Sequence, residues 1–188
     1  MGYTPEHTQR TRQRILASAR RLFKERGYEG VNIDTIMGNA GLTRGGFYAH
    51  FKSKDELFAQ AISETPVLDL LNRHPHDSGE PDDWTRRVLE EYVGSLHRDN
   101  VGGGCPIAVH ASSVTRAAPQ VRHAFTNAIK SLVDELTGRL AGTSDNPSNE
   151  ALAKLALVAG GVALARAVDD QDLSNNILDA CKDAIGPI

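Results

Sequence analysis

The sequence predicts an all-α protein of about nine helices. Along most of its 188 residues, apolar side chains recur at the spacing of a helix face and not at the spacing of a strand. Aromatic residues make up only 5% of the chain, and it has no run rich in Val, Ile, Tyr and Thr that would indicate a strand. Gly and Pro separate the periodic segments, where they serve as helix caps and breaks.

The first expected helix covers residues 5–26. Thr4 can cap this helix, Pro5 suits its first position, and Gly27 is a natural stop. Its apolar residues fall on one face, which we expect to be buried: Ile15, Leu16, Ala19, Leu22 and Phe23.

Two short helices follow. Asn32 can cap a helix over 33–40, which Gly41 ends, and Thr43 can cap another over 44–50. Two helices of about two turns joined by a tight turn have the size of a helix-turn-helix, spanning roughly residues 33–51.

A capping box predicts the start of the next helix. Ser53 and Glu56 have the required spacing, so a helix is expected from residue 54 to about 72. Residues 74–83 form a polar connection that contains Pro and Gly. Beyond it, helices are expected over 83–99, 106–116, 118–141, 148–169 and 171–185.

The second short helix carries side chains that suit DNA. Recognition helices present their N-terminal residues to base edges, and Arg44 near this N-terminus can fork onto a guanine. Four other side chains can donate to phosphates: Thr43, Tyr48, His50 and Lys54. Phe47, Phe51 and Leu57 are expected in the core instead, and Tyr48 is amphipathic enough to serve both purposes.

This stretch resembles the tetracycline-repressor (TetR) family of bacterial regulators. The resemblance lies in LTRGGFYAHF over 42–51 and KSKDEL over 52–57, and it covers roughly residues 8–60. Upstream, the matching positions are Ala19, Leu22, Phe23, Gly27, Tyr28, Ile36, Ala40 and Gly41. The resemblance implies a DNA-binding domain over 1–53 and a helical domain over 54–188 that binds a ligand and forms a homodimer. It also implies a repressor that binds a pseudo-palindromic double-stranded DNA operator and is released by a small-molecule inducer.

The resemblance also assigns roles to individual residues. Arg44 and Gly46 fall where base contacts are made, although a Thr, Ser or Ala is commoner at the position of Gly46. Backbone contacts are implied for Thr43, Tyr48, His50 and Lys54, and further phosphate contacts for Asn32 and Thr35 at the start of the preceding helix.

Charge, cysteine content and hydropathy agree with a cytoplasmic DNA-binding protein. Residues 1–60 hold ten Lys and Arg against six Asp and Glu, whereas the rest of the chain holds eleven against eighteen. A basic end on an acidic body is typical of a protein that meets a polyanion at one end, although ordinary charge scatter also explains it. No segment predicts a membrane span or an apolar signal region, and two cysteines fit a reducing compartment.

The apolar segment over 152–165 indicates an interface. Its apolar residues cover nearly the whole circumference of a helix, so we expect burial on most sides. A dimer seam shared with residues 173–185 explains this pattern, and an internal core helix is the alternative.

Cys105 is the candidate sensor residue. It follows Gly102–Gly104 and precedes Pro106, which places it at the N-cap of a helix, where the dipole lowers a thiol pKa. We expect the glycines to leave its sulfur approachable. The region is weakly similar to electrophile-sensing members of the family such as the N-ethylmaleimide-responsive repressor. The alternatives are a buried packing cysteine and a reversible apolar ligand with no thiol chemistry, and Cys181 is expected to be structural.

Other function classes have weak support in the sequence. The histidine spacings match no zinc pattern, no phosphate-cradling loop is found, and neither a metal nor a cofactor is expected. We therefore expect that the protein is not an enzyme. A thiol-dependent enzyme using Cys105 and a helical interaction module with a vestigial helix-turn-helix are the remote alternatives.

Overall fold

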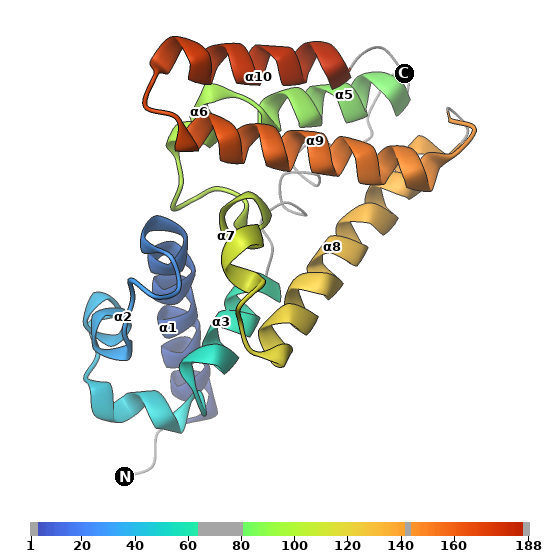
Figure 1. Cartoon of the computed structure of the whole chain (residues 1–188). Coiled ribbons are helices and arrows are strands. Elements are labelled where there is room, and N and C mark those ends of the chain that lie inside the picture. The colour runs from blue at the N-terminus through green and yellow to red at the C-terminus, as the bar shows by residue number, and fades with distance from the viewer. Residues whose placement is uncertain (1–3, 64–80, 142–143, 186–188) are drawn as a thin grey trace. The chain divides into compact units, whose positions relative to one another are not determined.

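The structure is a computed structural model that describes residues 4–63, 81–141 and 144–185. Over these residues it contains nine α-helices, one 3-10 helix and no β-strand, so the all-α prediction is confirmed (Figure 1). The elements are α1 (Pro5–Arg26), α2 (Ile33–Asn39), η1 (Arg44–Ala49), α3 (Lys54–Ser63), α5 (Pro81–Tyr92), α6 (Ser95–Asp99), α7 (Pro106–Val114), α8 (Pro119–Leu140), α9 (Pro147–Ala167) and α10 (Gln171–Ile185).

The helices divide into two compact units. The first contains residues 1–64 and 109–127, and the second contains residues 65–108 and 128–188. Helices α7 and α8 therefore each begin in one unit and end in the other. The functional boundary predicted after residue 53 stays a prediction.

The first unit is built on the apolar face of α1. The five apolar residues expected on this face are all buried, and α1 packs against both α2 and α3. Three rings complete the core: Phe23 lies 4.8 Å from Phe58 between ring centroids, and Tyr28 lies 4.9 Å from Phe58. Burial of this many aromatic and aliphatic side chains is the main source of stability for a small helical unit.

A histidine of α7 joins this aromatic cluster. The ring of His110 meets the ring of Phe58 edge-on, with 5.0 Å between centroids, and only 2% of His110 is exposed. Burial, with a smaller effect of the Lys24 charge, lowers the pKa of His110 from 6.5 to about 4. His110 is therefore neutral in the folded protein at physiological pH.

The second unit depends on a close approach between α9 and α10, which run side by side (Figure 1). A Cβ added to Gly161 of α9 would lie 2.3 Å from Sγ of Cys181 on α10, so only glycine permits this spacing. Lys154 Nζ donates to the carbonyl oxygen of Ile185 at 2.9 Å and so caps the end of α10.

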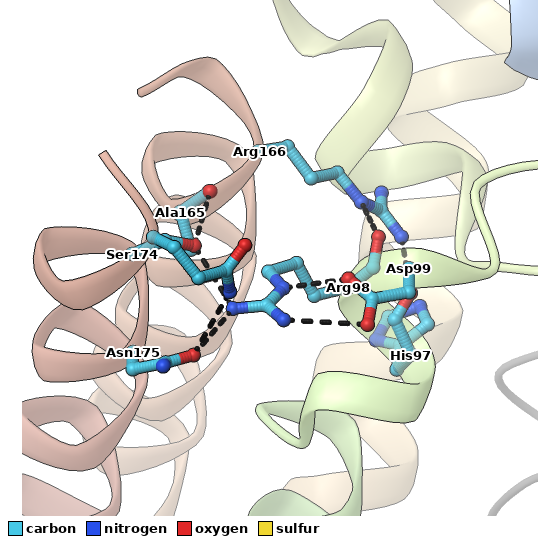
Figure 2. Close-up of polar contacts among 8 residues, drawn as sticks. His97, Arg98, Asp99, Ala165, Arg166, Ser174 and Asn175 are labelled. Carbon is cyan, nitrogen blue, oxygen red and sulfur yellow. Dashed lines mark hydrogen bonds and ion pairs between the residues drawn. The ribbon is translucent and has the colours of Figure 1, made fainter. Parts of the chain in front are cut away.

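Two arginines attach the short helix α6 to α9 and α10 (Figure 2). The Arg98 guanidinium donates to Ser174 Oγ at 3.0 Å and to Asn175 Oδ1 at 2.7 Å, and it pairs with the carboxylate of Asp99. Arg166 of α9 donates from Nε to the carbonyl oxygen of Arg98 and from Nη2 to that of His97. Carbonyl groups at the end of α6, which have no partner within the helix, are thereby satisfied.

The helix predicted over 83–99 is wrong in one respect, because the chain forms α5 and α6 with a break between them. Gly94 is extended, with φ −77° and ψ 155°, and it caps α6. Helical periodicity continues through residues 88–98, so sequence reasoning missed the change in direction that brings Arg98 to α10. The predicted extension of the helix from residue 54 to about 72 lies outside the described residues beyond Ser63.

No helix in the described part of the chain is long and apolar enough to cross a membrane.

Burial of His110 predicts a pH-dependent stability. Between pH 6.5 and about 4 the unfolded chain binds a proton at His110 that the folded chain does not, so the free energy of unfolding should fall as the pH decreases. A full shift of this size corresponds to about 3 kcal/mol. Urea unfolding of the wild type and of His110→Gln at pH 7.5, 6, 5 and 4 measures the effect. The other titrating groups are common to both proteins, so equal slopes in the two proteins would contradict the prediction.

Candidate functional site: a nucleic-acid interface and a buried thiol

The turn between α2 and η1 is held by one glycine and by α1. Gly41 has φ +67°, a left-handed conformation that L side chains rarely adopt, and Leu42 N donates to the carbonyl oxygen of Met37 at 2.9 Å. From α1, Arg14 Nη2 donates to the carbonyl oxygen of Ala40 at 2.6 Å, and Ser18 Oγ donates to that of Ile36 at 2.8 Å. The end of α2 is thus fastened to α1.

The second element of the helix-turn-helix is a 3-10 helix. Gly46 N donates to the carbonyl oxygen of Thr43 at 3.1 Å, which is the three-residue spacing of a 3-10 turn. Two adjacent glycines, Gly45 and Gly46, explain the departure from α geometry because glycine is a poor α-helix former. Phe47 is fully buried beneath η1, and Phe51 is also buried, as expected.

The outer face of η1 presents three of the predicted DNA contacts. Thr43, Arg44 and Tyr48 are exposed, with 62% of Tyr48 accessible. The Thr43 side chain makes no capping hydrogen bond. Gly46 is partly covered, and a Cβ there would be 3.7 Å from Met37 Cε, an ordinary contact, so the interface has room for the larger residue that is commoner at this position.

Two predicted phosphate contacts also cap α2. Asn32 Oδ1 accepts from Thr35 N at 2.8 Å and from Thr35 Oγ1 at 2.9 Å. The cap holds the N-terminus of α2, whose free backbone N–H groups favour an anion. The side-chain oxygens of Asn32 and Thr35 therefore have a structural task besides any contact with DNA.

The remaining two predicted contacts are half-buried. Lys54 Nζ lies 3.9 Å from the centroid of the Tyr28 ring, and burial lowers the pKa of Lys54. Burial, followed by the charges of Arg12 and His7, lowers the pKa of His50.

Sequence reasoning missed two charged residues of this interface. Asp34 Oδ2 lies 2.7 Å from Arg44 Nη1, and both side chains are exposed. Arg12 donates to the carbonyl oxygen of His50 and to Gln60 Oε1, and its guanidinium lies 4.2 Å from the centroid of the Phe51 ring. Asp34 lies in the first turn of α2, where the helix dipole stabilises an acidic side chain. Its position in the sequence therefore gave no sign of an ion pair with Arg44.

Cys105 occupies the predicted helix N-terminus. Helix α7 begins at Pro106, and Ile107 N donates to Cys105 Sγ at 3.4 Å. The expectation of an approachable sulfur is wrong, because Cys105 is only 3% exposed. Gly104 is itself buried, since a Cβ there would lie 2.9 Å from both Arg166 Nη2 and His97 Nε2. The glycines permit close packing and do not open the site.

Three polar side chains surround the thiol, and none was identified from the sequence. His97 Nε2 accepts from Cys105 N at 2.9 Å while Nδ1 donates to the carbonyl oxygen of Tyr92 at 2.5 Å, so His97 is neutral with its proton on Nδ1. Burial, and then the neighbouring Cys105, raise the pKa of Tyr92. The Tyr92 hydroxyl lies beside the sulfur, yet it forms no well-directed hydrogen bond with any described residue.

Arg166 supplies positive charge to this thiol site. Burial lowers the pKa of Arg166, whereas Tyr92 and Cys105 oppose that shift. Cys181 is also buried, and burial raises the pKa of its thiol. Among the residues that the structure describes, no group of three His, Cys, Asp or Glu side chains can hold a metal ion.

Known proteins resemble both the helix-turn-helix region and the fold. Residues 15–61 match the bacterial regulatory proteins of the tetR family. The chain is 37% identical over 89 residues to the HTH-type transcriptional regulator AcrR of Shigella flexneri, a match that covers 46% of this chain and 41% of AcrR. The chain thus spans less than half the length of that relative.

Solved structures extend the likeness of fold to nearly the whole chain. The reduced form of Escherichia coli NemR has a TM-score of 0.77 and 19% identity, covering 95% of this chain and 98% of NemR. AibR in complex with isovaleryl coenzyme A and operator DNA has a TM-score of 0.63 and 21% identity, covering 94% of this chain and 98% of AibR. The tetR match falls on the segment that contains the second half of α1, α2, η1 and most of α3, so this segment is similar to the regulatory proteins of the tetR family, and the all-helical fold of the described residues agrees with that similarity.

Proposed function

We propose that this protein is a homodimeric transcriptional repressor that binds a pseudo-palindromic DNA operator and leaves it when a small molecule acts on the second unit. The observation that carries the proposal is the exposed face of η1, where Thr43, Arg44 and Tyr48 project from a helix anchored by the buried Phe47. Such a face is rigid in its backbone and polar in its side chains, which is what reading a DNA groove requires.

The interface divides into base reading and backbone contacts. Arg44 is the base-reading residue, since its planar guanidinium can donate two hydrogen bonds to a guanine. Gly46 lets the backbone of η1 approach the bases. Six neighbouring side chains hold the sugar–phosphate backbone: Asn32, Thr35, Thr43, Tyr48, His50 and Lys54. Of these, Lys54 supplies positive charge and therefore binds DNA with little regard to sequence.

The dimer forms through the outer faces of α9 and α10. From Ala151 to the end of α9, the exposed or half-exposed residues other than Arg166 are all small or apolar: Leu152, Ala153, Ala156, Leu157, Ala159, Gly160, Ala163, Leu164 and Ala167. On α10 a stripe at helical spacing adds Leu173, Ile177, Ala180 and Ala184. Soluble monomers seldom expose contiguous apolar patches of this kind, and small residues allow the helices of a second copy to approach closely. A two-fold dimer then presents two recognition helices about one DNA turn apart, roughly 34 Å.

Release works through α7, the helix that begins beside Cys105 in the second unit and ends in the first. A ligand or a modification that displaces its N-terminus moves His110, which contacts Phe58 of α3 in the core of the DNA-binding unit. The effector must bind the displaced state more tightly, because only differential affinity shifts a conformational equilibrium.

Chemical modification of Cys105 is one form of this release. The Ile107 N–H and the Arg166 charge favour the thiolate, which is the reactive species. The burial of the sulfur restricts the reagent to a small one such as hydrogen peroxide. The thiolate attacks one peroxide oxygen, the O–O bond breaks, hydroxide leaves, and the cysteine becomes a sulfenic acid. The alternative is a reversible apolar ligand in the second unit, whose binding site Cys105 lines without reacting. The acyl-coenzyme A complex of AibR supports this alternative.

The proposed role places the protein in the cytoplasm with its DNA and assigns it no catalytic reaction. Its relatives are transcriptional regulators, and Cys105 is only 3% exposed.

Arg44→Ala tests the reading face. After an operator is selected from a random DNA pool, the substitution should cost about 1–3 kcal/mol of specific binding and relax preference at one position in each half-site. Lys54→Ala is the comparison, because it should weaken all sequences similarly and flatten the salt dependence. Fluorescence anisotropy with operator and scrambled DNA at several salt concentrations separates the two effects. Unchanged specific affinity in Arg44→Ala would show that η1 does not read bases.

Gly160→Glu tests the dimer. A Cβ added at Gly160 meets nothing within 4 Å in the protomer, so the glutamate should leave the fold intact and place an unpaired charge in the proposed seam. Light scattering should show a monomer, and operator affinity should fall. Gly138→Glu on α8, which is equally open, is the matched control and should stay dimeric. A stable Gly160→Glu dimer would remove this face of α9 from the interface.

Cys105→Ser tests the thiol. The variant should bind the operator as the wild type does, whereas hydrogen peroxide should release wild type and Cys181→Ser but not Cys105→Ser. Mass spectrometry should find the oxidised adduct on residue 105 of the wild type. Release of Cys105→Ser by peroxide, or faster modification of Cys181 than of Cys105, would favour the reversible apolar ligand.

A further inference from the structure

An acidic side chain lies within the surface that is proposed to meet DNA. Asp34 stands in the first turn of α2, and its Oδ2 is 2.7 Å from Nη1 of Arg44 at the start of η1. The Asp34 side chain is 53% exposed and that of Arg44 is 62% exposed. An ion pair this exposed contributes little to the stability of the free protein, so its value to the fold does not explain it.

The carboxylate opposes general binding to DNA. It repels phosphates, and it neutralises locally the cation that leads the recognition helix, so it lowers the number of counterions that binding releases. Asp34 therefore reduces affinity for every DNA sequence, unless it improves a contact that only some sequences provide.

The geometry of the pair identifies that contact. Both partners stand on fixed backbone, because Asn32 caps α2 while Phe47 anchors η1 in the core. Arginine is a flexible side chain whose donors lie in one plane. When Asp34 holds Nη1, the plane is set, and the Nη2 and Nε edge stays available for the two acceptors of a guanine, O6 and N7.

We propose that Asp34 is a positioning residue for sequence recognition: it orients the Arg44 guanidinium for guanine. It thereby lowers the affinity for DNA in general and increases the discrimination between bases. The proposal rests on the proposed function, because it needs Arg44 to read a base. In water the pair is weak, but at a protein–DNA interface, where water is displaced, the charge-assisted hydrogen bond is stronger. The pairing of Asp34 with Arg44 therefore matters most when the base is in place.

A double-mutant cycle tests the coupling between the two side chains. The proteins are wild type, Asp34→Asn, Arg44→Ala and the double variant, and Asp34→Asn keeps the size of the side chain while it removes the charge. Dissociation constants are measured for the selected operator, for operators changed at each base pair of a half-site, and for unrelated DNA. Glu6→Gln is the matched control, since it removes one charge from the first turn of α1 in the same unit.

In Asp34→Asn, affinity for unrelated DNA should rise several-fold. Preference for guanine at the base pair read by Arg44 should fall by about tenfold, within the range expected for loss of one good base contact. In the Arg44→Ala background, Asp34→Asn should not change base preference, and Glu6→Gln should leave preference unchanged in either background.

Three results would overturn the inference. Unchanged guanine preference in Asp34→Asn would show that Arg44 needs no orientation. A change at a different base pair that persists without Arg44 would show that Asp34 itself accepts from a base such as cytosine. An equal rise in affinity for all DNA with Glu6→Gln and Asp34→Asn, at constant preference, would reduce Asp34 to net charge. Absence of specific binding by the wild type would overturn the proposed function as well, and so is distinguishable from these three.

Discussion

The proposed DNA-binding surface depends on the attachment of two very short helices to α1. Helices of seven and six residues are not stable in water, because nucleation costs more than a few hydrogen bonds return. Here Ile36 and Phe47 are both buried in the core of the first unit, and Arg12 and Arg14 of α1 donate to carbonyl groups at the ends of η1 and α2. The outer face of η1 is therefore held rigid by α1, a helix that contributes none of the predicted base contacts.

The second unit also contains a short helix, α6, that arginine side chains hold in place. Helix α6 has only five residues, and Arg98 and Arg166 fasten it to α10 and α9. Its position in turn places His97, which accepts the backbone N–H of Cys105 and so holds the start of α7. In both units a short functional element is located by arginine donors that satisfy the free carbonyl groups at helix ends. Thus the environment of the thiol is determined by packing several residues away from it.

Helix α7 gives the proposed regulation a physical basis. Cys105 stands at its N-cap, and five residues further along, His110 lies against Phe58, which contacts Phe23 of α1. A helix transmits displacement along its axis because its backbone hydrogen bonds are continuous, and a close-packed aromatic core does not absorb such a displacement without rearranging. Both a covalent and a reversible effector are compatible with this path, since each needs only to move the start of α7.

The sequence by itself determined what depends on local spacing: the helical periodicity, the caps at Thr4 and Asn32, the start of α7 at Pro106, and the helix-turn-helix. Only the tertiary structure decided which distant residues meet. The pairing of Asp34 with Arg44, the break at Gly94, and the enclosure of Cys105 by Tyr92, His97 and Arg166 follow from helices packing against one another. Glycines before a cysteine suggested exposure, but the same lack of side chains let Arg166 and His97 close over Gly104. Sequence pattern reports which face of a helix is apolar, whereas the burial of a thiol depends on side chains from other helices, whose approach has no local signal.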